Sequence, residues 1–135
     1  MRSRAKAQAL AEMGVLVLVL VVLALGLSAV WGVVQVEVGL SAVAEEAARA
    51  AALAPSSALV EQRGTDRGLA VGAGYALKNG SLVVTIDSSQ FAAGGRVWAR
   101  ARYRLSSSDL PLIGAGGLDL EREQLEIVPG FRSLP

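Results

Sequence analysis

The chain has 135 residues, of which 53% are hydrophobic but only 4% aromatic, and its formal net charge is +1. A chain of this length holds at most one compact domain, and so balanced a charge gives no field that would attract nucleic acid, so we expect no nucleic-acid partner. Cysteine and histidine are both absent, which excludes disulfides, thiolate or imidazole metal sites, and Cys or His catalysis. We therefore expect no cofactor and no enzymatic activity.

A long apolar segment lies close to the N-terminus. Residues 13–34 read MGVLVLVLVVLALGLSAVWGVV and contain no charged side chain. A helix of about 22 residues is about 33 Å long, which is enough to cross a hydrocarbon core of about 30 Å. Residues 1–7 form a basic leader with Arg2, Arg4 and Lys6, whereas the residues directly after the segment are acidic. The positive-inside rule then predicts a single-pass protein of the cytoplasmic membrane, with its N-terminus in the cytoplasm and its C-terminus outside.

A cleaved secretory signal peptide is the alternative interpretation of such a start. Two features favour a retained anchor. The apolar run is longer than the about 7 to 15 residues usual in a signal peptide, and the helical pattern continues to Ala54 without a turn-rich cleavage site. We predict one helix over residues 8–54 and an outer domain over residues 55–135, because Pro55 ends the helical pattern.

Two features of the apolar helix bear on contacts with other chains. Glu12 stands directly against the apolar run, where a carboxylate is unfavourable unless a cation compensates it. It is either an interfacial residue whose carboxylate reaches back to the headgroups or to Lys6, or a pairing site for a second chain. Ala24, Ser28 and Gly32 recur every four residues, which fits either a helix-packing stripe or the ordinary small-residue content of a membrane helix.

The segment Ala7-Gln8-Ala9-Leu10-Ala11-Glu12, followed by an apolar helix, resembles the start of type IV pilins of the tight-adherence class. The TadE and TadF branch usually has Gly-Gln-Ala-Leu-Val-Glu here, so Ala7 replaces a glycine. The resemblance implies that a prepilin peptidase cleaves between Ala7 and Gln8. In the mature chain, the Glu12 carboxylate of one subunit would then neutralise the new N-terminal amine of its neighbour.

The resemblance to the TadE-like family implies a structural role. It predicts a minor pilin or pseudopilin of a Tad-type (type IVc) pilus or of a related secretion filament. The implied partners are other pilins of the same system, the prepilin peptidase, the inner-membrane assembly platform and the lipid bilayer. Residues 44–52 and the loop at residues 110–114 are also similar to TadE-family sequences. The alternative is a generic signal-anchored protein whose outer domain binds a ligand.

Beyond the span the pattern becomes amphipathic, so we expect the helix to continue into water with an alanine-rich ridge that receives a sheet. Glu45 and Arg49 are one turn apart and should pair. The apolar positions of the ridge are Val36, Leu40, Val43, Ala47, Ala50 and Ala54.

Residues 56–78 are mixed in composition and rich in glycine. The favoured prediction is a short helix capped by Thr65 or Asp66 and closed by Asn79-Gly80. The competing prediction makes the same Asn-Gly pair a hairpin turn. The expected apolar face of the helix comprises Leu69, Ala73, Ala76 and Leu77.

Three strands are predicted after this segment, over residues 82–86, 96–105 and 118–128. The middle one alternates between apolar and basic residues, which is typical of a half-buried strand. In the last strand, Leu118 and Leu120 are out of phase with Leu125 and Ile127, which predicts a bulge or a bend between them. The order of elements predicts an α+β fold, in which a small three-stranded antiparallel sheet packs on the long N-terminal helix.

Basic residues occupy alternate positions of the middle strand. They are Arg96, Arg100, Arg102 and Arg104. Such a row can bind an acidic polymer, for example DNA or a surface polysaccharide, or it can pair with acidic residues of the neighbouring strand. We favour the pairing and expect Glu121, Glu123 and Glu126 as partners.

Overall fold

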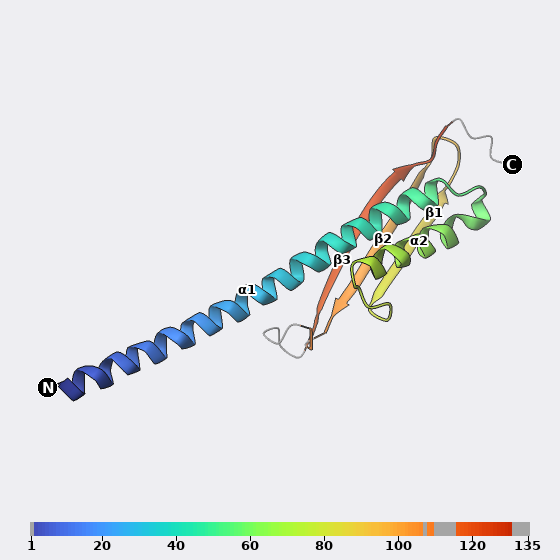
Figure 1. Cartoon of the computed structure of the whole chain (residues 1–135). Coiled ribbons are helices and arrows are strands. Elements are labelled where there is room, and N and C mark those ends of the chain that lie inside the picture. Colours follow the sequence, from blue (N-terminus) through green and yellow to red (C-terminus); the bar gives the residue numbers. More distant parts are fainter. Residues whose placement is uncertain (1, 107, 110–115, 131–135) are drawn as a thin grey trace.

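The computed structural model describes residues 2–106, 108–109 and 116–130, so the loop at residues 110–114 lies outside the described residues. The elements are α1 (Arg2–Ala52), the 3-10 turn η1 (Ser57–Leu59), α2 (Val60–Gly74), β1 (Leu82–Gln90), β2 (Arg96–Leu105) and β3 (Leu118–Ile127). The first half of α1 projects alone, and its second half packs with α2 against one face of the sheet (Figure 1). The predicted α+β class is confirmed.

α1 is a single unbroken helix of 51 residues, about 77 Å long. It begins at Arg2, so the basic leader continues into the apolar segment without a turn. It ends at Ala52 rather than at the expected Ala54. The Ala54 N–H donates to the carbonyl oxygen of Ala51 at 3.0 Å, a tightened last turn of the kind that often ends a helix. Pro55 follows directly and cannot continue the ladder.

The sheet is antiparallel with the strand order β1-β2-β3. β2 has the predicted bounds, because strict alternation of apolar and basic residues marks a strand with one buried face. Of the predicted bulge or bend in β3, the bulge is wrong, since the register of β3 with β2 runs without a shift. Leu120 lies opposite the buried Tyr103, whereas Leu125 lies opposite Trp98 on the outer face. The apolar residues of β3 therefore change face along a regular strand.

The core lies between the second half of α1 and the inner face of the sheet. Small side chains dominate it, so α1 can lie close to the strands. The buried hydrophobic residues of α1 are Leu40, Val43, Ala44, Ala47, Ala48, Ala51 and Ala52. The predicted alanine ridge is thus present, although Val36 and Ala50 are only half-buried.

α2 confirms the helix prediction over the hairpin, but its buried face is not the predicted one. Its buried residues are Val60, Gly64, Gly68 and Gly72. A Cβ added to Gly64 would lie 2.8 Å from side-chain atoms of Ile86 and 3.1 Å from the carbonyl oxygen of Ala47. The glycines let α2 fit between α1 and β1, where an alanine would already be too large.

The start of α2 is set by packing and not by a capping side chain. Leu59 precedes the helix and makes no side-chain cap, and the 3-10 turn leads the chain into it. Val60, the first residue, is fully buried. Thr65 and Asp66, the expected caps, lie inside the helix.

α2 ends in a Schellman motif instead of at the predicted Asn79-Gly80 pair. The Leu77 N–H donates to the carbonyl oxygen of Gly72 at 2.9 Å, which is the bond that defines this motif. Ala76 occupies its left-handed position with φ 58°, where glycine is the usual residue. The Asn-Gly pair lies instead in the turn that leads into β1.

Candidate functional site

The first half of α1 is an exposed apolar rod (Figure 1). Every side chain from Arg4 to Leu25 is exposed. The most apolar 18-residue window has a mean hydropathy of 2.9, and none of it is buried. An exposed apolar surface of this size marks a contact with lipid or protein. Within the described part of the chain, α1 is the one helix long and apolar enough to cross a membrane, which is compatible with a single-pass membrane protein.

The residues predicted for processing and assembly lie on the first turns of α1. Ala7 and Gln8 are exposed and helical, and Glu12 follows one turn later. Gln8 Nε2 donates a hydrogen bond to Glu12 Oε1 at 3.2 Å. Among the described residues Glu12 forms no ion pair, so the structure does not make the contact with Lys6 that one interpretation invoked. Within the described part of the chain, no basic side chain compensates the Glu12 carboxylate.

Ala24, Ser28 and Gly32 lie one turn apart on α1 and differ in their burial. Ala24 and Ser28 are exposed, whereas Gly32 is half-buried. The neighbouring Val33 packs against the cluster under the sheet, which brings Gly32 to the margin of the folded domain. Ala24 is about 18 Å from Glu12 along the helix. The predicted residues therefore share a rod but do not converge on one site.

The outer face of the sheet carries the basic row, and two cross-strand pairs are confirmed. Arg100 Nη2 donates to Glu123 Oε2 at 2.8 Å, and Arg102 Nη2 donates to Glu121 Oε2 at 2.7 Å. The bond from Arg102 is the main cause that lowers the pKa of Glu121. The bond to Glu123 is the main cause that raises the pKa of Arg100. The pairs neutralise the row, which leaves little charge for an acidic polymer.

Glu126, the third expected partner, is not part of the row. It lies opposite Val97 on the inner face of the sheet. On the same face, Arg122 pairs with Glu37 of α1 at 2.9 Å and so joins the edge strand to the helix. Sequence reasoning missed this contact. The sequence feature that could have indicated it is a charged residue, Arg122, at a strand position that alternation assigns to the inner face. Glu126 is a second charged residue on that face.

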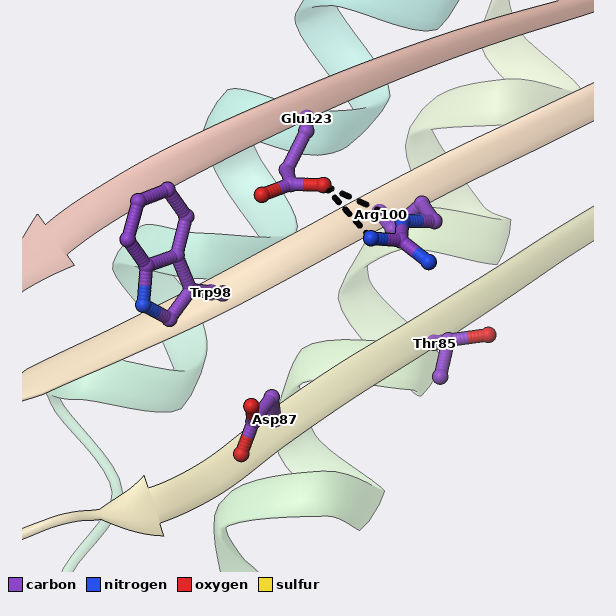
Figure 2. A pocket seen from close by; sticks show the side chains of 5 residues that line it. All are labelled: Thr85, Asp87, Trp98, Arg100 and Glu123. Atoms are coloured by element: carbon purple, nitrogen blue, oxygen red, sulfur yellow. Dashed lines mark hydrogen bonds and ion pairs between the residues drawn. The ribbon is translucent and has the colours of Figure 1, made fainter.

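A hollow of about 240 Å³ opens on the outer face where the three strands run side by side. Figure 2 shows its lining, formed by Thr85, Asp87, Trp98, Arg100 and Glu123. The Asp87 carboxylate accepts the Ser89 N–H at 2.9 Å, and this backbone bond is the main cause that lowers the pKa of Asp87. The hollow combines an aromatic ring with carboxylates and one guanidinium. Such a surface can hold a polar group, and the described residues contain no cluster suited to a metal ion.

Apolar side chains adjoin this hollow on the outer face. Leu125 lies opposite Trp98, and Ile127 lies opposite Arg96. Trp98 is 37% exposed and Ile127 is 63% exposed. The sequence did not predict this patch, because the shift in alternation at Leu125 and Ile127 was interpreted as a bulge or bend and not as a change of face. The signal was Trp98, an aromatic residue in the phase of the basic row.

Comparisons with models of protein families, with characterised proteins and with solved structures found no match for this chain. Its function therefore has to be inferred from its own residues and their arrangement. The exposed half of α1 and the outer face of the sheet are the two surfaces that carry such an inference.

Proposed function

We propose that the chain is a structural subunit, a TadE-like minor pilin of a Tad-type pilus or related secretion filament, without catalysis of its own. The observation that carries the proposal is the division of α1 into an exposed apolar half and a half built into a folded domain. Lipid can cover the apolar half before assembly, and helices of neighbouring subunits can cover it afterwards. The outer domain need not refold when neighbouring helices replace lipid around the apolar half.

Glu12 gives the assembly step its electrostatic basis. Cleavage between Ala7 and Gln8 would create an α-ammonium group one helical turn before Glu12. The ammonium of one subunit and the Glu12 carboxylate of the next would then compensate each other where neither is well solvated. A pair of this kind fixes the register between helices more than it adds stability.

A second candidate is a single-pass anchored protein whose outer domain binds a ligand and never enters a filament. The hollow beside Trp98 favours it, because an aromatic ring with adjoining charged groups is a common way to hold a polar ligand. This candidate needs neither cleavage before Gln8 nor a special role for Glu12.

The length of the mature chain separates the two candidates. We expect intact-mass measurement on purified membranes from cells with an active prepilin peptidase to show a chain that begins at Gln8. A chain that keeps residues 1–7 in those cells would remove the main support for the pilin.

Glu12→Gln tests the assembly step. Breaking one half of a buried ion pair costs about 3–5 kcal/mol, which is more than a hundredfold in an assembly equilibrium. We expect co-purification with partner pilins to be lost at equal membrane abundance. Glu45→Gln is the matched control, because Glu45 is an exposed acid farther along α1, and it should assemble normally. Normal assembly of Glu12→Gln would favour the anchored ligand-binding protein.

A further inference from the structure

The folded domain starts within the apolar segment and not beyond it. Ala29 and Val33 of α1 are half-buried against the cluster that contains Leu105, and Leu118 packs against the same cluster. Leu105 and Leu118 mark the end of the sheet where β2 stops and β3 starts. We call this end of the sheet, which carries the charged pair Arg104 and Asp119 next to the last strand pair, the proximal end. It reaches α1 inside the expected span, so no free stalk separates the domain from the membrane.

The length of helix left to lipid is shorter than a bilayer. From Met13 to Ala29 α1 rises about 24 Å, whereas a hydrocarbon core is about 30 Å thick. Either the proximal end enters the outer leaflet by about 6 Å, or the membrane covers α1 further toward its start, about as far as Ala9. The two arrangements differ in which charged groups leave water.

The charges that leave water decide between the two arrangements. The second takes Glu12 out of water, where a neighbouring chain compensates it in the proposed function, whereas the first takes the charged pair at the proximal end out of water. The Arg104 and Asp119 side chains are 66% and 61% exposed and lie 4.0 Å apart, so immersion would strip water from both. A residue suited to the headgroup region lies at this level. Trp31, two residues after Ala29, is 64% exposed on α1. Tryptophan and tyrosine are enriched at membrane interfaces.

We propose that the proximal end rests on the headgroups of the outer leaflet and acts as a stop that fixes the depth of α1. The partner is a lipid surface. Paired charges of opposite sign, from Arg104 and Asp119, match the phosphate and ammonium groups of a zwitterionic headgroup, and Trp31 lies among the headgroups. The stop draws the helix before Met13 into the hydrocarbon. This inference rests on the membrane anchoring in the proposed function.

The absence of cysteine allows a direct test with single-cysteine variants of the full chain. Gly116→Cys places a fluorescent label at the proximal end, where an added Cβ has no neighbour within 4 Å. Ala93→Cys is the matched control, because it is exposed in the loop between β1 and β2 at the other end of the sheet. Leu20→Cys reports on insertion of the span.

The labelled chains are reconstituted in phosphatidylcholine vesicles that carry a nitroxide either on the headgroup or at mid-chain. We expect loss of fluorescence at residue 116 with the headgroup nitroxide, no loss at residue 93, and loss at residue 20 with the mid-chain nitroxide. Equal signals at residues 116 and 93, with residue 20 quenched, would overturn the stop and leave the anchor in place. An unquenched label at residue 20 would overturn the anchoring and the stop with it.

Discussion

Gly64→Ala tests whether the close approach of α2 to its neighbours sets the stability of the outer domain. In an open helix this change stabilises by about 0.5–1 kcal/mol, because alanine has the higher helix propensity. Here the new Cβ would lie 2.8 Å from Cγ1 and Cδ1 of Ile86 and 3.1 Å from the carbonyl oxygen of Ala47. Overpacking costs about 1–3 kcal/mol, and a backbone oxygen cannot rotate away, so we expect a net loss of about 1–2 kcal/mol.

Urea unfolding of the full chain in detergent micelles measures this loss. Trp98 fluorescence is followed in a Trp31→Phe background, because Trp31 lies on the exposed part of α1 and would report on the wrong region. The loss should appear as a lower midpoint at an unchanged slope. Gly74→Ala is the matched control, since an added Cβ there has nothing within 4 Å. If both variants unfold at the same urea concentration, close packing does not hold α2 and the reasoning is refuted.

Three other changes probe the rest of the domain. A fragment that begins at Ser56 should show no cooperative thermal transition, because α1 forms one side of both core clusters; a sharp transition would contradict this. Ala76→Gly should raise the free energy of unfolding in urea by about 0.5–1 kcal/mol, because it relieves a left-handed alanine, and no gain would show that Ala76 is unstrained. The hydrogen bond from Lys78 is the main cause that lowers the pKa of Asp109 from 3.8 to about 2. A carboxyl group whose pKa is lowered by folding stabilises the folded state at every pH above its unfolded-state pKa. That contribution is lost as the pH falls from the unfolded-state pKa to the folded-state pKa. Asp109→Asn should therefore lose less stability than the parent chain between pH 3.8 and about 2, and parallel acid-unfolding curves would exclude the effect.

The sequence could predict the elements whose buried face is formed by apolar side chains at regular spacing. β2 was found with its bounds because Val97, Ala99, Ala101, Tyr103 and Leu105 face the core in strict alternation. The buried face of α2 was missed for the opposite reason. Periodicity counts apolar side chains, whereas Gly64, Gly68 and Gly72 contribute by having none. Only the positions of Ile86, Val84 and Leu82 across the interface show why glycine is required there.

β3 shows a second feature that the sequence alone could not predict. A bulge and a change of face both move the apolar phase by one residue, so the sequence alone does not distinguish them. The regular pairing with β2 resolves the choice in favour of a change of face. The hollow depended on the same information, because Asp87 and Trp98 are opposite each other only in the observed register of β1 and β2. Ala7, Gln8 and Glu12 stay predictions, because their expected partners belong to other chains.

Small residues join the folded domain closely to α1. Because alanines of α1 and glycines of α2 supply the contact, each residue buries little area and the elements must lie close together to gain from it. The second half of α1 is then part of the core, and the unbroken helix joins it directly to the exposed half. A rotation of the exposed half about its axis would carry the sheet with it. In an assembly of the proposed kind, contacts along the apolar rod would therefore also set the direction in which Trp98 and the outer face point.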